Sequence, residues 1–336
     1  MESSITMNVS ENVPWSEIPP FGQIDSDLRQ VNDLIHRSFE VRDSAGELTP
    51  LCDHVSTHSG KMLRPGLVLL TGRCFGPLTA EHTRVAAMVE MIHHATLLHD
   101  DVIDEGRMRR GAPTANALWG NESAVLLGDF VLSQVFRMAS DLDASAAKII
   151  AATAIRVCEG ELRQAMQKRN WQLSESQYVE IITDKSAAFF SGCCRLGSLL
   201  SHADEDQVEA LSQFGLLAGI AFQITDDLLD IAGDEQRTGK ATLNDFARDK
   251  LTLAVIHLLR TVDEARRADI CALLESPEGS GQPLVDMLSQ HGSLQYARER
   301  ADDYVTKATQ ALECLPASKD KDALIETAHF MANRAA

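Results

Sequence analysis

The segment QVEALSQFGLLAGIAFQITDDLLDIAG, residues 207–233, decides the fold class. Its apolar residues recur at helical spacing. Around it, proline is absent between positions 113 and 277, in a stretch rich in Ala, Leu, Ile, Gln and Glu. Such a stretch is typical of consecutive helices. Because no alternating segment between Asn-Gly or Asp-Gly turns indicates a hairpin, we predict an all-α protein, a single large helical bundle with a central active-site cavity.

Composition narrows the function classes. The chain has 336 residues, of which 44% are hydrophobic and 24% charged, as in ordinary globular proteins. Its net charge of −18 argues against nucleic acid or an anionic membrane surface as the main partner. There is no signal peptide, and no apolar run approaches the roughly 18 residues of a transmembrane helix. The seven cysteines lack paired or metal-site spacing. We therefore expect reduced thiols and a cytoplasmic location.

Polar and proline-rich segments mark the boundaries. Residues 1–20 are predicted to be a flexible N-terminal arm, and residues 21–336 a single all-α domain. ESPEGSGQP, residues 275–283, is predicted to be an internal loop.

Two Asp-Asp-x-x-Asp motifs carry the chemistry. They consist of Asp100, Asp101 and Asp104, and of Asp226, Asp227 and Asp230. On a helix spanning residues 88–105, the carboxylates of the first motif share one face with His93, and like charges four residues apart destabilise a bare helix. Magnesium binds through one or two carboxylates together with substrate phosphates. Two facing helices with such motifs could therefore clamp a diphosphate through bridging magnesium ions.

Basic residues accompany both motifs in this acidic chain. In LLHDDVIDEGRMRRG, residues 97–111, the acids come first and the arginines follow. Arginine suits bidentate phosphate contacts, and lysine acts as a point charge. The combination indicates an anionic ligand. The basic candidates are Lys61 and Arg64 in SGKMLRP, Arg109 and Arg110 after the first motif, and Lys240 and Lys250 after the second.

These motifs occur together with others in a recognisable order. The chain contains GKMLRP, EMIHHATLLHDDVIDEGRMRRG, NESAVLLGDF, DKSAAFF, FQITDDLLDIAGD and a Gly-Lys pair at 239–240. Over about residues 20 to 335 it resembles the trans-polyprenyl diphosphate synthases of the isoprenoid synthase fold, most of all the long-chain octaprenyl and heptaprenyl enzymes.

The resemblance implies a magnesium-dependent prenyltransferase. Such an enzyme condenses isopentenyl diphosphate repeatedly onto an allylic diphosphate, here farnesyl or geranylgeranyl diphosphate. The product would be an all-trans polyprenyl diphosphate of about 35 to 45 carbons, with octaprenyl diphosphate for quinone side chains the best candidate. The resemblance also implies a homodimer, three magnesium ions per site, and transient membrane contact through the lipid product.

Residue roles follow from the matching positions. Catalytic roles fall on Asp100, Asp101, Asp104, Lys185, Asp226 and Asp227, and magnesium would be held by both aspartate motifs, including Asp230. The allylic diphosphate would contact Arg109, Lys185, Ser186, Gln223, Lys240 and Lys250. Isopentenyl diphosphate would contact Lys61, Arg64, His93 and Arg110.

Four positions depart from the family pattern. Met62 stands where arginine is common, and Ser186 replaces a threonine but keeps the hydroxyl. Asp249 replaces a glycine before Lys250, and Ala254 replaces a proline after it. The last two changes concern the loop that carries Lys250.

Small side chains next to the first motif bear on product length. Ala95 and Thr96 lie about one helical turn before Asp100, where a bulky aromatic side chain closes the elongation tunnel in members of this family. Small residues there imply an open tunnel, or alternatively close helix packing. Phe136 and Met138 are candidates for a deeper floor.

Other functions compete with this interpretation. Glu90-x-x-His93 and Glu326-x-x-His329 match the di-iron signature of helical bundles, but they give the aspartate motifs no role. A non-catalytic subunit of a heteromer would typically have degraded motifs, and a terpene cyclase would not need Lys61 and Arg64. Lesser signals are interpreted as packing: a zinc site at Cys52, His54 and His58 lacks a fourth ligand, and Cys193-Cys194 lies among small residues.

Overall fold

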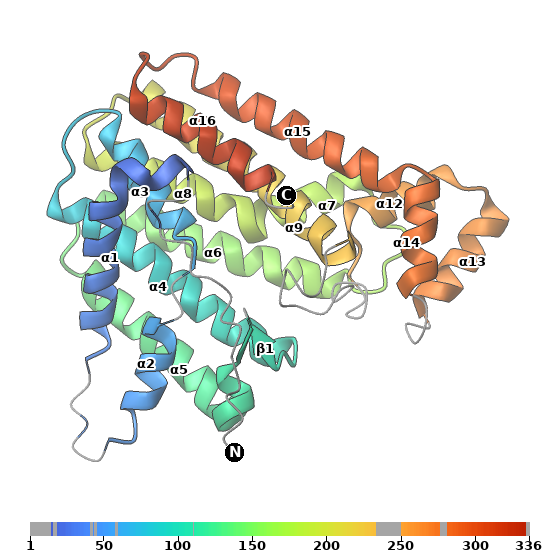
Figure 1. The fold of residues 1–336 in the computed structure, drawn as a ribbon, viewed down its shortest axis with the longest axis horizontal. Coiled ribbons are helices and arrows are strands. Elements are labelled where there is room, and N and C mark those ends of the chain that lie inside the picture. Colours follow the sequence, from blue (N-terminus) through green and yellow to red (C-terminus); the bar gives the residue numbers. More distant parts are fainter. Residues whose placement is uncertain are drawn as a thin grey trace, which may run out of the picture.

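A computed structural model describes residues 15, 19–40, 43, 46–57, 60–109, 111–232, 250–275 and 281–333 (Figure 1). Helices account for nearly all of them, as predicted. They are α1 (Asp25–Ser38), α2 (Thr49–Thr57), α3 (Leu63–Arg73), α4 (Ala80–Ile103), α5 (Ala115–Ala139), α6 (Ala144–Met166), α7 (Glu175–Ile182), α8 (Ala188–Leu200), α9 (Glu205–Ala232), α12 (Leu253–Thr261), α13 (Glu264–Glu275), α14 (Gly281–Gln290), α15 (Ser293–Ala311) and α16 (Lys319–Ala332). A 3₁₀ turn, Pro19–Ile24, precedes α1.

Helix α9 is the centre of the bundle. It packs against α8, α15 and α16, and it contributes to both apolar clusters of the core. Leu211 and Phe214 belong to the first cluster, whereas Ile224 and Leu228 belong to the second. Within the described part of the chain, α9 is the one helix long and apolar enough to span a membrane by length and composition, and 61% of its apolar window is buried in the protein. Core packing thus accounts for its apolar sequence.

Helix α4 packs against α3, α5 and α8 and ends within the first aspartate motif. Asp104 caps the helix, and its backbone N–H donates to the Asp100 carbonyl at 2.8 Å. Glu105 then takes a left-handed conformation with φ 51°, so the helix ends two residues earlier than the predicted 105. The end of α4 therefore presents the three carboxylates on a fixed turn.

A short hairpin follows α4. Strand β1 (Met108–Arg109) pairs antiparallel with β2 (Ala112–Pro113). The prediction that the chain contains no hairpin is therefore wrong at this point. Two-residue strands are too short for an alternating pattern, and the turn requires only a residue such as Gly111, which has φ 77°. The hairpin folds the chain back along the end of α4.

A π-helical turn joins α7 to α8. Thr183–Ala187 form this turn, which packs against α6 and α9. Helix α6 approaches it at Gly160, where an added Cβ would clash with the backbone of Lys185. Single π turns inside helices are uncommon and occur frequently at functional sites. Glycine at position 160 is thus required for this close approach.

We predict that Gly160→Ala destabilises the protein by about 1–3 kcal/mol, because the clash involves backbone atoms that cannot easily shift. Alanine is a better helix former than glycine by roughly 1 kcal/mol. The predicted loss therefore means that the clash costs more than this gain in helix propensity. Urea unfolding measures the effect. Ala151→Gly, at an exposed position of α6, is the control for propensity alone. Equal or higher stability of Gly160→Ala would contradict the close contact.

Candidate active site

Arg109 folds back onto the first aspartate motif. Its Nε lies 2.9 and 3.0 Å from the two carboxylate oxygens of Asp101, and its Nη2 lies 2.8 Å from Oδ1. Asn116 supports this arrangement, since its side-chain amide donates to the Asp101 and Gly106 carbonyls at 3.1 and 3.0 Å. Asp101 is buried. The hairpin therefore holds a guanidinium against a carboxylate that the sequence assigns to a metal.

Asp100 lies in a strongly acidic environment. The pKa of its carboxyl is raised to about 6, chiefly by burial and also by the nearby charges of Glu161 and Asp104, whereas the charges of Lys185 and Arg109 lower it. Glu161 lies on α6 and Lys185 lies on the π-helical turn, so the charges that act on Asp100 come from both of these elements. A further positive charge beside Asp100, in addition to those of Lys185 and Arg109, would lower the pKa of its carboxyl and favour the ionised form.

Lys185 leaves the π-helical turn toward α6. Its Nζ donates to Gln164 Oε1 at 2.7 Å and pairs with Glu161 Oε1 at 3.1 Å. Ser186, the next residue, points toward α9, where its hydroxyl donates to Gln223 Oε1 at 2.6 Å. The π-helical turn thus connects α6 to α9.

The second motif is held by a hydrogen-bonded chain. Gln223 Nε2 donates to Asp227 Oδ1 at 2.8 Å, and the Tyr178 hydroxyl on α7 donates to Asp227 Oδ2 at 2.6 Å. Ser186, Gln223, Asp227 and Tyr178 therefore form one continuous network across the π-helical turn, α9 and α7. It fixes the orientation of the Asp227 carboxylate in the buried part of α9.

Lys250 connects the segment after α9 with the first motif. Its Nζ lies 3.5 Å from Asp104 Oδ1, and its side chain is 13% exposed. Lys250 is thus at the site despite the departures from the family pattern around it. Ala254 lies buried in the first turn of α12. Arg110, Lys240 and Asp249 lie outside the described residues, so their predicted roles stay predictions.

The residues assigned to isopentenyl diphosphate lie against aromatic rings. The Arg64 guanidinium lies 5.0 and 4.6 Å from the ring centroids of Phe189 and Phe190 on α8. Lys61 Nζ lies 5.1 Å from the ring centroid of Phe330 on α16. Cation–π contacts of this kind hold long basic side chains in place without neutralising their charge.

Backbone geometry also marks this region. Met62, between Lys61 and the start of α3, has φ 53° and caps the helix in a left-handed conformation. Its side chain is buried. His93 on α4 is half-buried, and its carbonyl accepts from the Thr96 hydroxyl at 2.8 Å.

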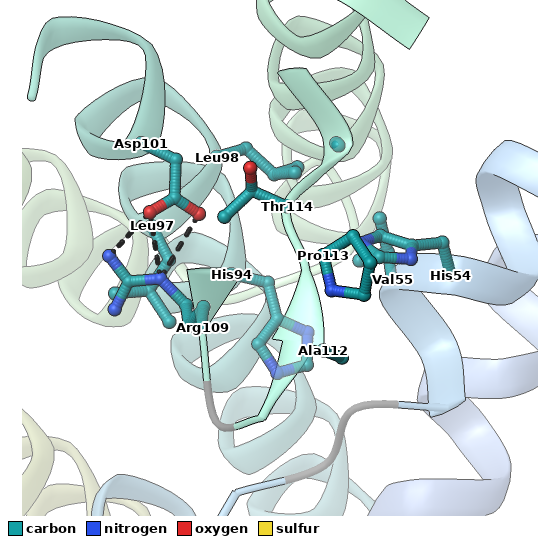
Figure 2. A pocket seen from close by; sticks show the side chains of 11 residues that line it. His54, Val55, His94, Leu97, Leu98, Asp101, Arg109, Ala112, Pro113 and Thr114 are labelled. Atoms are coloured by element: carbon teal, nitrogen blue, oxygen red, sulfur yellow. Dashed lines mark hydrogen bonds and ion pairs between the residues drawn. The ribbon is translucent and has the colours of Figure 1, made fainter. Parts of the chain in front are cut away.

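A small pocket lies behind the Asp101–Arg109 pair (Figure 2). It is bounded by α2, α4 and the hairpin, and Figure 2 shows the side chains that line it, among them His54 and Pro113. His54 packs edge-on against Trp119, with the ring centroids 5.3 Å apart. No residue of α9 lines the pocket, so it belongs to the support of Arg109 rather than to a space between the two motifs.

The donor set fits a divalent cation. The acidic side chains of both motifs and Glu161 are hard oxygen donors, which magnesium and similar cations prefer. Burial, together with the nearby charges of Glu161 and Asp104, raises the pKa of Asp100, so a bound cation would favour its ionised form. Among the described residues, no three His, Cys, Asp or Glu side chains converge into a metal cage. A cation here would thus need further oxygen ligands, such as those of a diphosphate.

The chain-length candidates differ in their surroundings. Ala95 is buried on α4, and Thr96 is half-buried. Met138 is buried near Ser38, whose hydroxyl lies 3.8 Å from its sulfur. Phe136, in contrast, is 71% exposed on α5. Its side chain lies on the outer face of the single chain, and its predicted role in product length stays a prediction. On a helix, two residues separate an inward from an outward position.

Several residues of the site were missed from the sequence. Glu161, Gln164, Tyr178 and Asp184 all touch groups of the site or its supports. The Glu-x-x-Gln spacing in EGELRQ, residues 159–164, was the available signal for the first two, because residues three apart share a helix face. Tyr178 had no comparable signal, since its partner Asp227 lies 49 residues away.

Known proteins are similar to this chain in sequence and in fold. A sequence profile named polyprenyl synthetase matches residues 46–288. The chain belongs to this family. The octaprenyl diphosphate synthase of Escherichia coli is 32% identical over 315 residues, covering 93% of this chain and 92% of that protein. The short chain isoprenyl diphosphate synthase of Methanothermobacter thermautotrophicus is 30% identical over 323 residues, covering 91% and 99%.

Solved structures agree with the fold. The crystal structure of a decaprenyl diphosphate synthase from Rhodobacter capsulatus superposes with a TM-score of 0.88 at 36% identity, and the match covers 95% of this chain and 99% of that one. The predicted isoprenoid synthase architecture is confirmed. The protein is a prenyl-transferring enzyme of the polyprenyl diphosphate synthase type, which acts on isoprenoid diphosphates.

The family assignment removes the di-iron alternative. The side chains of Glu326 and His329 are exposed on α16, whereas a di-iron site needs ligands inside a bundle. The lesser signals agree with packing roles. Cys193 and Cys194 are fully buried in α8, burial raises the pKa of the Cys193 thiol to about 12, and all seven cysteines are free.

We predict that Arg109→Lys weakens the binding of an isoprenoid diphosphate by about tenfold or more, because lysine cannot reproduce the bidentate contact with Asp101. Calorimetric titration with farnesyl diphosphate measures the change. Arg107→Lys is the matched control, since Arg107 lies in the same hairpin with an exposed side chain. Equal affinities of the two variants would show that the guanidinium geometry is unimportant.

Proposed function

We propose that the enzyme is a magnesium-dependent trans-prenyltransferase that elongates farnesyl or geranylgeranyl diphosphate with isopentenyl diphosphate to a product of about 35–45 carbons. The proposed product is octaprenyl diphosphate for quinone side chains. The observation that carries this proposal is the pairing of Arg109 with Asp101 and of Lys250 with Asp104 at the end of α4. The long-chain names of several relatives support the product class. We further propose one catalytic domain over residues 21–336 and a cytoplasmic location.

The chemistry needs charge stabilisation at one place. The allylic C–O bond breaks, the alkene of isopentenyl diphosphate forms a new C–C bond with the allylic carbon, and a proton is lost to the departing diphosphate. Arg109, Lys185 and Lys250 stand where negative charge develops on that diphosphate. The apolar core around α4 and α8 keeps water away from the reactive carbon.

Magnesium is proposed as the cation held by Asp100, Asp101 and Asp104 together with Asp226, Asp227 and Asp230, with three ions per site. Bound magnesium supplies positive charge to the diphosphate oxygens during departure. Arg109 holds Asp101, and Tyr178 with Gln223 holds Asp227, so one carboxylate of each motif is oriented in advance. Lys61 and Arg64 are proposed to hold isopentenyl diphosphate beside α16 and α8.

The test is product mass. Purified protein with magnesium, farnesyl diphosphate and isopentenyl diphosphate should give a ladder of products that ends at about 35–45 carbons, measured by mass spectrometry after dephosphorylation. Termination at about 20 carbons would keep the enzyme class and reject the long-chain assignment. No elongation from any allylic starter would reject the proposed function and favour a missing partner subunit.

We predict that Ala95→Phe shortens the product, because a phenyl ring at a buried position next to Asp100 fills space that the growing chain would use. Product mass spectrometry gives the readout. Glu81→Phe places the same ring at an exposed position on the first turn of α4 and should leave the product unchanged. An active Ala95→Phe enzyme with the wild-type product would reject the tunnel assignment.

We predict that Tyr178→Phe weakens cation binding by about tenfold, because Asp227 loses the hydroxyl that orients it. Manganese binding followed by electron paramagnetic resonance, with diphosphate present, measures this without turnover. Tyr304→Phe on α15 removes a hydroxyl away from both motifs and serves as the control. Unchanged manganese affinity in Tyr178→Phe would contradict the orienting role.

We also propose a homodimer through α5 and α6. These two helices cover α4 and α8, and they carry most of the large exposed apolar side chains among the described residues. The set comprises Leu118, Val125, Leu126, Phe136, Ile155, Leu162 and Met166. Apolar surface of this extent favours burial against another protein surface. A second copy of the chain offers the same surface.

We predict that Leu126→Glu converts the dimer to monomers at micromolar concentration, because a charge would be buried at an apolar interface. Sedimentation velocity measures the state. Leu48→Glu changes an exposed leucine outside α5 and α6 and should leave the dimer intact. A monomeric wild-type protein would reject this interface.

A further inference from the structure

One face of α6 is shaped to receive the π-helical turn. Arg156, Gly160 and Arg163 follow one another at steps of four and three, so they share this face. Gly160 lets the backbone of Lys185 approach closely. The two arginines lie on either side of that contact. The π-helical turn Thr183–Ala187 therefore docks between two basic side chains.

Asp184 on this turn binds both arginines. Arg156 Nε donates to Asp184 Oδ1 at 2.6 Å, and Arg163 Nη1 donates to Oδ2 at 2.6 Å. Each carboxylate oxygen thus has its own guanidinium partner. Asp184 is buried, whereas the side chains of Arg156 and Arg163 are 44% and 53% exposed. A buried carboxylate is stable only with such partners.

The next two residues of the turn face the candidate active site. The Lys185 ammonium group contacts Glu161 and Gln164, and its charge lowers the pKa of Asp100. The Ser186 hydroxyl donates a hydrogen bond to Gln223. Three consecutive side chains therefore point in three directions. Because a helical turn rotates as a unit, the direction in which Asp184 is held determines where Lys185 and Ser186 point.

We propose that Asp184, clamped by Arg156 and Arg163, is a positioning residue that orients Lys185 and Ser186 toward the diphosphate of the allylic substrate; this inference rests on the proposed function. The clamp has a second effect. The arginines neutralise a carboxylate adjacent to Lys185, which would otherwise compete with the diphosphate for the ammonium group of that lysine.

The two effects predict how strongly each variant should lose affinity for the allylic substrate. Asp184→Asn keeps the shape but releases the arginines, so the turn loses its fixed rotation. The double variant Arg156→Gln with Arg163→Gln leaves the carboxylate unpaired beside Lys185, so it should weaken substrate binding more than Asp184→Asn does. Adding Asp184→Asn to the double variant removes the competing charge, and affinity should return to the level of Asp184→Asn alone.

Steady-state kinetics with each substrate varied in turn, and calorimetric binding of farnesyl diphosphate in magnesium without isopentenyl diphosphate, test the proposal. In Asp184→Asn, KM and Kd for farnesyl diphosphate should rise about tenfold, with KM for isopentenyl diphosphate within about twofold of wild type. Asp184→Glu restores the charge and should recover most of the affinity.

The control is Asp320→Asn, which breaks a comparable ion pair between α3 and α16, where Arg73 Nε lies 2.9 Å from Asp320 Oδ1. It should lower thermal stability and leave both KM values unchanged. If Asp184→Asn behaves in the same way, or raises both KM values equally, the clamp is merely structural and the proposal is overturned. If Asp184→Asn fails to fold, the single variants Arg156→Gln and Arg163→Gln, which keep half of the clamp, provide the same comparison.

The outcomes separate this inference from the proposed function. A wild-type protein that elongates neither farnesyl nor geranylgeranyl diphosphate nor any other allylic starter rejects both. An active wild type with an unchanged KM for farnesyl diphosphate in Asp184→Asn and in the double arginine variant rejects the clamp alone.

Discussion

The clustering of carboxylates on two helices, α4 and α9, is the constraint on which the rest of the site depends. The first aspartate motif lies at the C-terminal end of α4, and the second lies on α9. A helix carries partial negative charge at its C-terminus, so carboxylates there are unfavourable in addition to repelling one another. Burial is the main cause of the raised pKa of Asp100, and the nearby carboxylates of Glu161 and Asp104 add to it. The site is therefore stable only because cationic groups are brought to it.

Those cationic groups come from separate parts of the chain, and each has its own structural device. The hairpin after α4 returns Arg109 to Asp101. The segment before α12 brings Lys250 to Asp104. The π-helical turn carries Lys185 toward α6 and the end of α4. The hairpin, the segment before α12 and the π-helical turn, which interrupt an otherwise regular helical bundle, thus carry the cationic side chains that lie near the aspartates.

The regular helices supply rigidity for this arrangement. Helix α9 contributes to both apolar clusters, so the second motif is built on a helix that is anchored in the core at both ends. Around it, Tyr178 and Gln223 fix Asp227, and Ser186 links that network to the π-helical turn. Rigid supports of this kind reduce the reorganisation needed when charge develops on a substrate. The aromatic contacts of Lys61 and Arg64 have the same effect for the other basic residues.

The sequence by itself determined the helical class, the two aspartate motifs and the basic residues beside them, because periodicity and spacing are local properties that a single helix already expresses. The folded chain decided the rest. The pairing of Arg109 with Asp101, the exposure of Phe136, and the partners of Tyr178 and Asp184 depend on which helix faces meet. Residues such as Tyr178 and Asp227 are far apart in sequence and carry no mutual pattern, so only tertiary packing selects them as partners.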